Sequence, residues 1–158
     1  MTRKKRLGKK SQAPHAIQRR ICLLLWGTII ILRDKWCQYH LPVKIPANHP
    51  HHVFPKGKCP ATQYDTRVGI GLCGGCHEFE VPDPIWHPVN VRLLGGQDAY
   101  DRLEALSHVR MSKPDLKLIE LMLWQDLAEY GVYKPDLWVT WKEWKKEKFL
   151  RERRSHER

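Results

Sequence analysis

The sequence lacks a hydrophobic run long enough to cross a membrane. Its longest apolar stretch, residues 21–32, contains Gly27 and Thr28 and falls short of the roughly 18 residues that a membrane span requires. Five cysteines in 158 residues are too few for a disulfide framework. The basic N-terminus followed by this stretch superficially resembles a signal peptide, but residues 32–35 offer no small-residue cleavage site. We therefore expect a cytoplasmic protein with reduced thiols and no membrane association.

The first 20 residues contain no acidic residue, so part of the excess positive charge of the chain lies there. Residues 1–20 hold eight Lys and Arg and no Asp or Glu, whereas residues 142–158 hold eight basic and four acidic residues. Residues 21–141 are close to neutral, so the formal charge of +11 is concentrated at the two ends. Such basic ends favour a polyanionic partner, because neutralising phosphates releases their counterions. A solubilising basic tail is the alternative interpretation.

Length and composition indicate one folded domain with tails. The chain is 42% apolar and 28% charged, which is typical of globular proteins. We expect a flexible basic arm over residues 1–15, a domain over 16–90 that includes a leading helix, and a helical extension over 91–158. The apolar run predicts a buried helix over 16–34, although the three consecutive isoleucines at 29–31 leave a strand possible there.

Helical signals dominate the sequence after residue 88. A helix is expected over residues 98–108. A second helix is expected after Ser112, a favourable N-cap, with Pro114 in its first turn and Gly131 at its end. Its apolar residues recur at helical spacing, at Leu116, Ile119, Leu123, Leu127 and Tyr130. A last, strongly charged helix leads into the basic C-terminal tail.

Residues 35–80 have little periodicity and are rich in Cys, His, Pro and Gly, which indicates a metal as organiser. Two pairs with knuckle spacing stand out, Cys37 with His40 and Cys73 with Cys76. A turn of that length directs two ligands at one point, and two such turns complete a tetrahedral zinc site. Cys59 competes with His40 as the fourth ligand, and unpaired buried cysteines are the alternative to zinc.

Histidines cluster around these pairs. His51 and His52 are consecutive, and His77 directly follows the second pair. A strand through residues 51–54 would place the imidazoles of His51 and His52 on opposite faces, so that one can hold a metal while the other acts on a water. An imidazole has a pKa suited to removing a proton near neutral pH. A His-rich surface loop is the alternative.

Residues 33–79 resemble the HNH endonucleases, also called His-Me finger or ββα-metal nucleases. The segment RDKWCQYH resembles the opening R-D-x-x-C-x-x-C of zinc-supported members, and HHVFPKG resembles their first strand. The segment YDTRVGIGLCGGCHEF resembles y-D-x-x-N-G-(I/V)-x-L-C-x-x-C-H, which is common in phage and bacterial members. The fold implied is α+β, with a small zinc-stabilised ββα-metal core, flanking α-helices and basic tails.

The resemblance also implies roles for individual residues. His52 corresponds to the general base, while His51 and His77 correspond to ligands of a catalytic divalent metal such as Mg²⁺ or Mn²⁺. The four structural zinc positions correspond to Cys37, His40, Cys73 and Cys76, with His40 in place of the usual Cys. The middle Asn of the family motif is Val68 here. Glu80 and His87 are further candidates for the catalytic metal.

Two functions follow from these observations. The first is metal-dependent hydrolysis of DNA phosphodiester bonds in a bacterial or phage-infected cell, with packaging (terminase) or recombination proteins as family-level partners. The second, favoured by Val68, is a zinc-structured DNA-binding or adaptor protein with weak or no cleavage. In either case the basic ends are expected to grip the DNA backbone, through Arg3, Lys4, Lys5, Arg6, Lys9, Lys10, Lys145, Lys146, Lys148, Arg151, Arg153 and Arg154.

Overall fold

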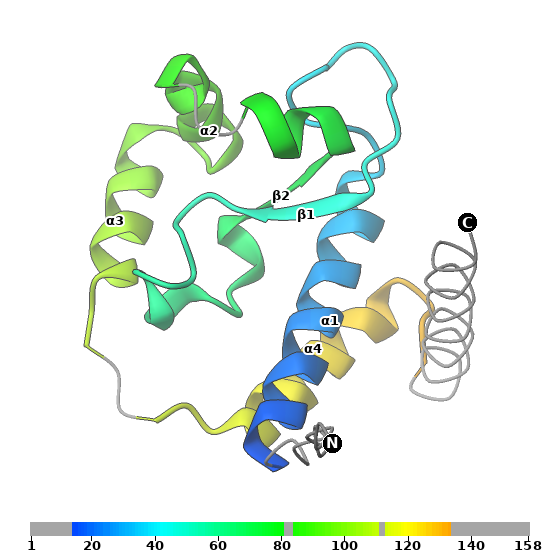
Figure 1. Ribbon diagram of the computed structural model, residues 1–158, viewed down its shortest axis with the longest axis vertical. Coiled ribbons are helices and arrows are strands. Elements are labelled where there is room, and N and C mark those ends of the chain that lie inside the picture. The colour runs from blue at the N-terminus through cyan, green and yellow to red at the C-terminus, as the bar shows by residue number, and fades with distance from the viewer. Residues whose placement is uncertain (1–13, 81–83, 111–112, 134–158) are drawn as a thin grey trace, which may run out of the picture.

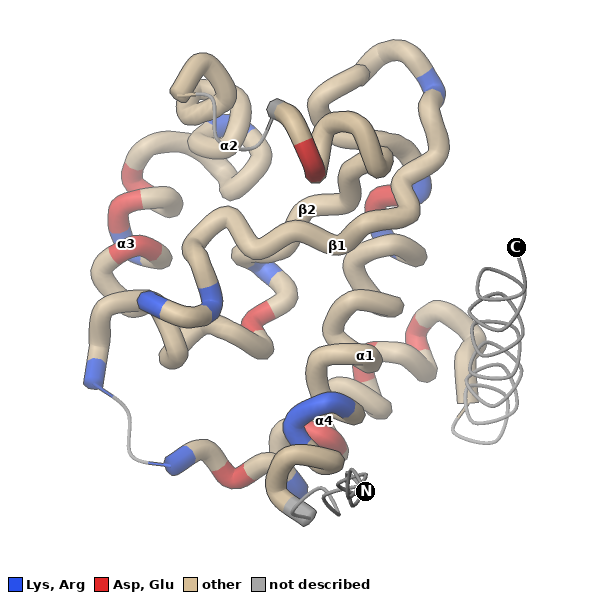
Figure 2. Tube along the Cα trace, in the orientation of Figure 1, with Lys and Arg blue, Asp and Glu red and all other residues tan. Residues whose placement is uncertain are grey.

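The computed structural model describes residues 14–80, 84–110 and 113–133. Within them a two-stranded sheet lies between two pairs of helices, with α1 and α4 on one side and α2 and α3 on the other (Figure 1). The twelve basic residues predicted to contact DNA, together with the predicted last helix, lie outside these ranges. Over the described residues, basic and acidic positions are interspersed (Figure 2).

The first helix, α1, spans Pro14–Asp34, so the isoleucines at 29–31 are helical and a strand there is excluded. Its buried residues recur with the period of a helix, at Cys22, Leu25, Trp26, Ile29 and Ile30. By length and apolarity alone α1 passes as a candidate membrane span, which differs from the expectation based on its shorter apolar run, but a core helix passes the same test. Here its buried stripe packs against α4 and the sheet.

The sheet pairs β1, His49–His52, with β2, Gly69–Leu72, in antiparallel register, so that His49 faces Leu72 and His52 faces Gly69. The strand predicted over 51–54 therefore begins and ends two residues earlier. Every residue of β2 is buried. A Cβ at Gly69 would lie 2.5 Å from Ile30 Cδ1, so α1 packs directly on the strand backbone.

The loop between the strands carries two short 3₁₀ helices, Pro60–Thr62 and Thr66–Val68. After β2 the chain turns at once into a π-helical turn, Cys76–Glu80. A further 3₁₀ turn, Pro84–Trp86, leads into α2, His87–Leu93. The order is thus strand, loop, strand and helical turn, and the helices together with the antiparallel sheet are consistent with the predicted α+β class.

Two apolar cores flank the sheet. One surrounds Phe54, Ile70 and Leu72 and includes Tyr100 and Leu103 of α3, Gln97–Ser107. The observed α3 agrees with the predicted helix over 98–108 to within one residue. The other core lies between α1 and α4. The predicted division of the chain at residue 90 stays a prediction.

The second predicted helix, α4, spans Leu116–Glu129, and its start differs from the expectation. Asp115 is the N-cap, because its carboxylate accepts hydrogen bonds from the backbone N–H groups of Lys117 and Leu118. The prediction of Ser112 as N-cap was wrong. At the other end Gly131 has a φ of +73°, the left-handed conformation that favours glycine after a helix.

Candidate metal centre and histidine cluster

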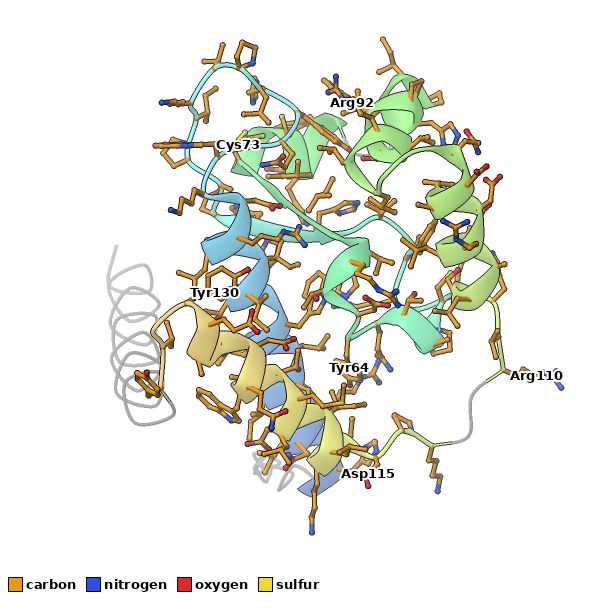
Figure 3. The ribbon with its side chains drawn as sticks, turned by 180° about the vertical axis from the view of Figure 1, so that it is seen from behind. Tyr64, Cys73, Arg92, Arg110, Asp115 and Tyr130 are labelled. Atoms are coloured by element: carbon orange, nitrogen blue, oxygen red, sulfur yellow. The ribbon has the colours of Figure 1, made fainter. Side chains whose placement is uncertain are left out.

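Four metal-binding side chains converge at one end of the sheet. Cys37 and His40 lie in the turn after α1, and Cys73 and Cys76 lie in the turn after β2. Their ligand atoms all lie within 4.8 Å of one another. His40 Nδ1 is 3.4 Å from Cys37 Sγ, 3.7 Å from Cys73 Sγ and 3.5 Å from Cys76 Sγ. Figure 3 shows Cys73 at the end of the molecule opposite Asp115.

These distances fit one tetrahedral zinc ion. Bonds of ~2.3 Å to sulfur and ~2.0 Å to nitrogen, at a tetrahedral angle, place the two ligand atoms about 3.5 Å apart. The four residues predicted as zinc ligands can therefore bind a structural metal such as zinc. Cys59 is buried in the apolar core and is not part of this group, so His40 is the fourth member.

Backbone contacts hold the first knuckle in place. The N–H of Cys37 donates to the carbonyl of Ile45, and the N–H of Gln38 donates to the carbonyl of Gly71 in β2. Between the two ligands, the ring of Tyr39 stacks on Trp86 with centroids 4.2 Å apart. The knuckle is thus fastened to the sheet on one side and to the turn before α2 on the other.

The two thiols of the second knuckle, Cys73 and Cys76, have pKa values that are shifted in opposite directions. The backbone N–H of Cys76 lowers the pKa of the Cys73 thiol, which favours the thiolate that a metal requires. Burial, reinforced by the neighbouring thiols of Cys37 and Cys73, raises the pKa of Cys76 to about 12. Without a metal these thiols cannot all ionise, so metal binding has to displace protons.

The rings of His51 and His77, the two residues predicted to bind a catalytic metal, are neighbours in the structure. Their ring centroids are 5.6 Å apart in an edge-to-face arrangement. Burial, followed by the neighbouring His77 and His52, lowers the pKa of His51 to about 4. Burial and the adjacent His49 also lower the pKa of His77. Both rings are therefore neutral near pH 7, which is the form that binds metals.

His49 is a third member of this cluster, and sequence reasoning missed it. Its ring lies 5.3 Å from that of His77. The spacing of two residues between His49 and His51 is the sequence signal that could have found it, because residues i and i+2 of a strand share a face. Of the other candidates, His87 packs edge-to-face against Tyr100 instead, and the side chain of Glu80 is outside the described part of the chain.

His52 lies in a different environment from the cluster. Its ring stacks on the indole of Trp26, with centroids 3.7 Å apart and planes 12° apart. Its Nε2 donates a hydrogen bond to the carbonyl oxygen of Gln63 at 2.9 Å. Since a carbonyl only accepts, the neutral ring carries its lone pair on Nδ1. Burial and the nearby Lys56 lower the pKa of His52, although the Gln63 carbonyl opposes them.

The loop that supplies this carbonyl is anchored to α1. Trp26 Nε1 donates to the carbonyl of Asp65 at 3.0 Å, and Arg19 donates to the side-chain oxygen of Gln63 at 3.3 Å. The Asp65 carboxylate caps the following 3₁₀ helix by accepting from the N–H of Arg67. Helix α1 therefore supplies the ring that stacks on His52 and also anchors the loop whose Gln63 carbonyl accepts the hydrogen bond from His52.

Val68 lies in the apolar core and is fully buried. Its carbonyl accepts from the N–H of Val53, and its own N–H donates to the carbonyl of Asp65. The backbone at this position thus ties the loop to the end of β1. An apolar side chain suits the packing here, and Trp26 and Asp65 hold the loop by other hydrogen bonds.

A cavity of about 580 Å³ lies elsewhere, between the end of α1, β2 and α3. Arg33, Arg67 and Arg102 line it, but none of the four histidines of β1 and the π-helical turn does. Arg33 is committed to the carbonyls of Thr66 and Gly69, and Arg67 pairs with Asp65. The cavity is separate from the histidine cluster.

The chain matches no protein family, no curated protein and no solved structure. Function therefore has to be inferred from the chemistry of its own residues.

Proposed function

We propose that this protein is a metal-dependent endonuclease of the HNH type, which hydrolyses DNA phosphodiester bonds with His52 as the general base. The observation that carries the proposal is the pair of environments on β1. His52 has an acceptor on Nε2 and a lone pair on Nδ1, while His51 lies on the other side beside His77. A base and a bound divalent metal close to each other are a common arrangement for hydrolysis by an activated water, and these two side chains would supply both.

The strand–loop–strand–helical turn order supports the ββα-metal interpretation. The first strand carries His51 and His52, the loop supplies the carbonyl that orients His52, and the turn after the second strand supplies His77. The four clustered Cys and His side chains support the zinc-stabilised form of that core, since a metal ion bound by them would fasten the turn before β1 to the turn after β2.

The proposed reaction assigns one task to each of these side chains. Nδ1 of His52 accepts a proton from water, whose oxygen attacks the phosphorus as the bond to the leaving oxygen breaks and that oxygen takes up a proton. The low pKa of His52 keeps the base neutral and ready at physiological pH. His51 and His77 would hold a divalent ion, which stabilises the charge that develops on the phosphate and on the leaving oxygen.

DNA binding is proposed to rest on the basic ends, residues 1–20 and 142–158, where the excess positive charge lies. Contacts of this kind neutralise phosphates and carry little sequence information. The charge of Lys56 lowers the pKa of His52, and we propose that this lysine contacts a phosphate near the base.

The test is a nicking assay on supercoiled plasmid with the untagged full chain. The protein is treated with EDTA, resupplied with one equivalent of Zn²⁺, and then given Mg²⁺, Mn²⁺ or Ni²⁺. Wild type is expected to nick only with added metal, and His52→Ala is expected to lose at least about 100-fold in rate, within the range for general bases. His108→Ala is the matched control, because His108 is an exposed residue at the end of α3.

Cleavage by His52→Ala at the wild-type rate would show that His52 is not the general base. Equal inertness of wild type and variant, with DNA still bound by both, would favour the adaptor function instead.

A further inference from the structure

We propose that the cavity between the end of α1, β2 and α3 binds a small aliphatic carboxylate. The hydrocarbon chain of this ligand lies along the wall of the cavity, and its carboxylate pairs with Arg102 at the rim. Within the described residues, none of the proposed metal ligands and none of the histidines of β1 lines this cavity. The inference therefore goes beyond the proposed function and neither uses nor requires DNA cleavage.

The cavity has the size of a small-molecule site and a largely aliphatic wall. Its volume of about 580 Å³ lies within the range of roughly 300–1,000 Å³ that ligand sites commonly have. Ile70 and Leu103 are buried in this wall, whereas Leu106 is 42% exposed. The apolar surface thus extends from the protein core to solvent at the edge of α3. The apolar lining residues are Ile70, Leu93, Leu94, Ala99, Leu103 and Leu106.

Two glycines shape the part of the wall that α2 and α3 contribute. Gly95 and Gly96 join the two helices with φ angles of +100° and +96°, in the left-handed region that favours glycine. A Cβ at Gly95 would lie 3.4 Å from the Cβ of Ala99, so the turn runs close to the start of α3. Leu93 and Leu94, which directly precede the turn, therefore line the same cavity as the residues of α3.

The charged groups beside β2 are paired with one another. Arg33 donates through Nε and Nη2 to the carboxylate of Asp34, which also accepts from the backbone N–H of Gly71. Arg67 forms an ion pair with Asp65 at 2.6 Å. Because each of these carboxylates already has a cation beside it, the described wall holds no uncompensated negative charge that would repel an anion.

Arg102 differs from the other charged residues of the lining. Its guanidinium forms no ion pair or hydrogen bond with any residue in the described ranges. Asp98 lies one turn earlier on α3, at the usual spacing for an ion pair within a helix, yet the two side chains are not paired. Arg102 lines the cavity together with Leu106 of the same helix. A guanidinium can bind both oxygens of a carboxylate through two parallel N–H groups, so an anion is expected at this rim.

The lining favours an alkyl carboxylate over a nucleotide. None of the described residues that line the cavity is aromatic, so a nucleobase would find no ring on which to stack. The single unpaired guanidinium matches the single negative charge of a carboxylate. Aliphatic side chains favour a saturated chain, since each buried methylene adds to the affinity. Affinity is therefore expected to rise with chain length until the wall is covered.

The test is a titration of zinc-loaded, untagged full-length protein with sodium octanoate, followed by ¹H–¹⁵N NMR. Saturable shifts are expected for the backbone amides of Ile70, Leu94 and Leu103. Arg102→Gln is expected to bind octanoate about 10-fold more weakly, because a hydrogen-bonded charge pair is lost. Arg92→Gln is the matched control and is expected to bind as wild type does, because Arg92 is an exposed arginine of α2 that does not line the cavity.

Two further probes separate the two parts of the ligand. Acetate keeps the carboxylate but lacks the chain, and octylammonium keeps the chain but reverses the charge. Each is expected to bind at least about 10-fold more weakly than octanoate, because one loses the apolar contact and the other the pairing with Arg102.

Four results would overturn the inference. They are the absence of saturable shifts with octanoate, equal affinity of wild type and Arg102→Gln, octylammonium binding as tight as that of octanoate, and shifts located away from the cavity. The titration contains no DNA, so its outcome does not depend on whether the protein nicks plasmid. Failure of the nuclease assay and failure of this site are therefore distinguishable.

Discussion

The indole of Trp26 and the imidazole of His52 lie face to face, 3.7 Å apart, although the two residues belong to different elements. Trp26 also donates to the carbonyl of Asp65, in the loop whose Gln63 carbonyl accepts from His52. One side chain of α1 therefore sets both the plane of the His52 ring and the loop that fixes its tautomer. Helix α1, which lies outside most of the motif similarity, is part of the proposed site.

The first prediction separates these two roles of Trp26. Trp26→Phe keeps an aromatic face but loses the hydrogen bond to Asp65, and is expected to cost about 1 kcal/mol of stability. Trp26→Ala also removes the stack and leaves a cavity, and is expected to cost about 3–5 kcal/mol. Denaturant unfolding measures both. Plasmid nicking is expected to survive in the Phe variant and to fall in the Ala variant at a temperature where both are folded; equal nicking would show that the stack does not position His52.

A second prediction concerns pH. The pKa of His52 is lowered, so its ring stays neutral at pH values below the ordinary pKa near 6.5, and the neutral ring is the form that the proposed reaction needs as a base. In the pH–rate profile of nicking, measured at saturating DNA and metal, the rising limb should therefore lie below pH 6.5. Lys56→Gln removes a cation that disfavours the protonated ring, so the pKa rises and the limb moves to higher pH. Lys58→Gln is the control; a limb that does not move in Lys56→Gln would contradict the assignment.

A third prediction concerns the cysteine site. Cys76→Ser is expected to lose the tightly bound zinc and several kcal/mol of stability, because zinc binding contributes directly to folding in such sites. Cys59→Ala, which removes a buried cysteine outside the group, is expected to retain one zinc per chain. Elemental analysis after gel filtration reads both. A full zinc equivalent in Cys76→Ser, or its loss in Cys59→Ala, would mean that the fourth ligand has been misassigned.

A fourth prediction tests the contact between α1 and the sheet. Gly69→Ala places a methyl group 2.5 Å from Ile30 and 2.6 Å from Trp26, and is expected to cost at least about 1–3 kcal/mol through overpacking. Gly57→Ala meets nothing within 4 Å and is expected to leave stability unchanged or slightly higher. Thermal melts compare the two. Equal melting temperatures would show that α1 does not rest on β2 as described.

The grouping of Cys37, His40, Cys73 and Cys76 was predictable because each pair is local. A knuckle spacing of three residues determines that two ligands point the same way, whatever the rest of the chain does. The choice between His40 and Cys59 was not predictable, since it depends on which side chain the apolar core takes up. In the structure Cys59 packs in that core and His40 faces the thiols.

The histidine cluster was predictable only in part. His51 and His77 came from the motif, but His49 required the limits of β1 and its register with β2. The strand was placed two residues too late, which left His49 outside it. The contacts of His52 with Gln63 and Trp26 could not be predicted from the sequence either. They arise because tertiary packing brings the 16-residue loop between the strands and helix α1 together around His52.

Helix periodicity predicted where α3 and α4 lie but not how α4 begins. Ser112 and Asp115 are both good N-caps by residue type, and Pro114 is compatible with the first turn after Ser112. Asp115 prevails because its carboxylate reaches two free backbone N–H groups while Leu116 enters the core against α1. Residue preferences alone do not rank two such candidates.

The glycine at position 74 has a consequence for how this segment can change over generations. Residues 73–77 read Cys-Gly-Gly-Cys-His. Under the proposed function four of the five are expected to be constrained: the two thiols, the imidazole of His77, and Gly74, which lies close to His49. A Cβ at Gly75, by contrast, would meet nothing within 4 Å. In a saturation library over these five residues, most tolerated substitutions should therefore occur at Gly75, and sequence variation among related chains is expected at the same position.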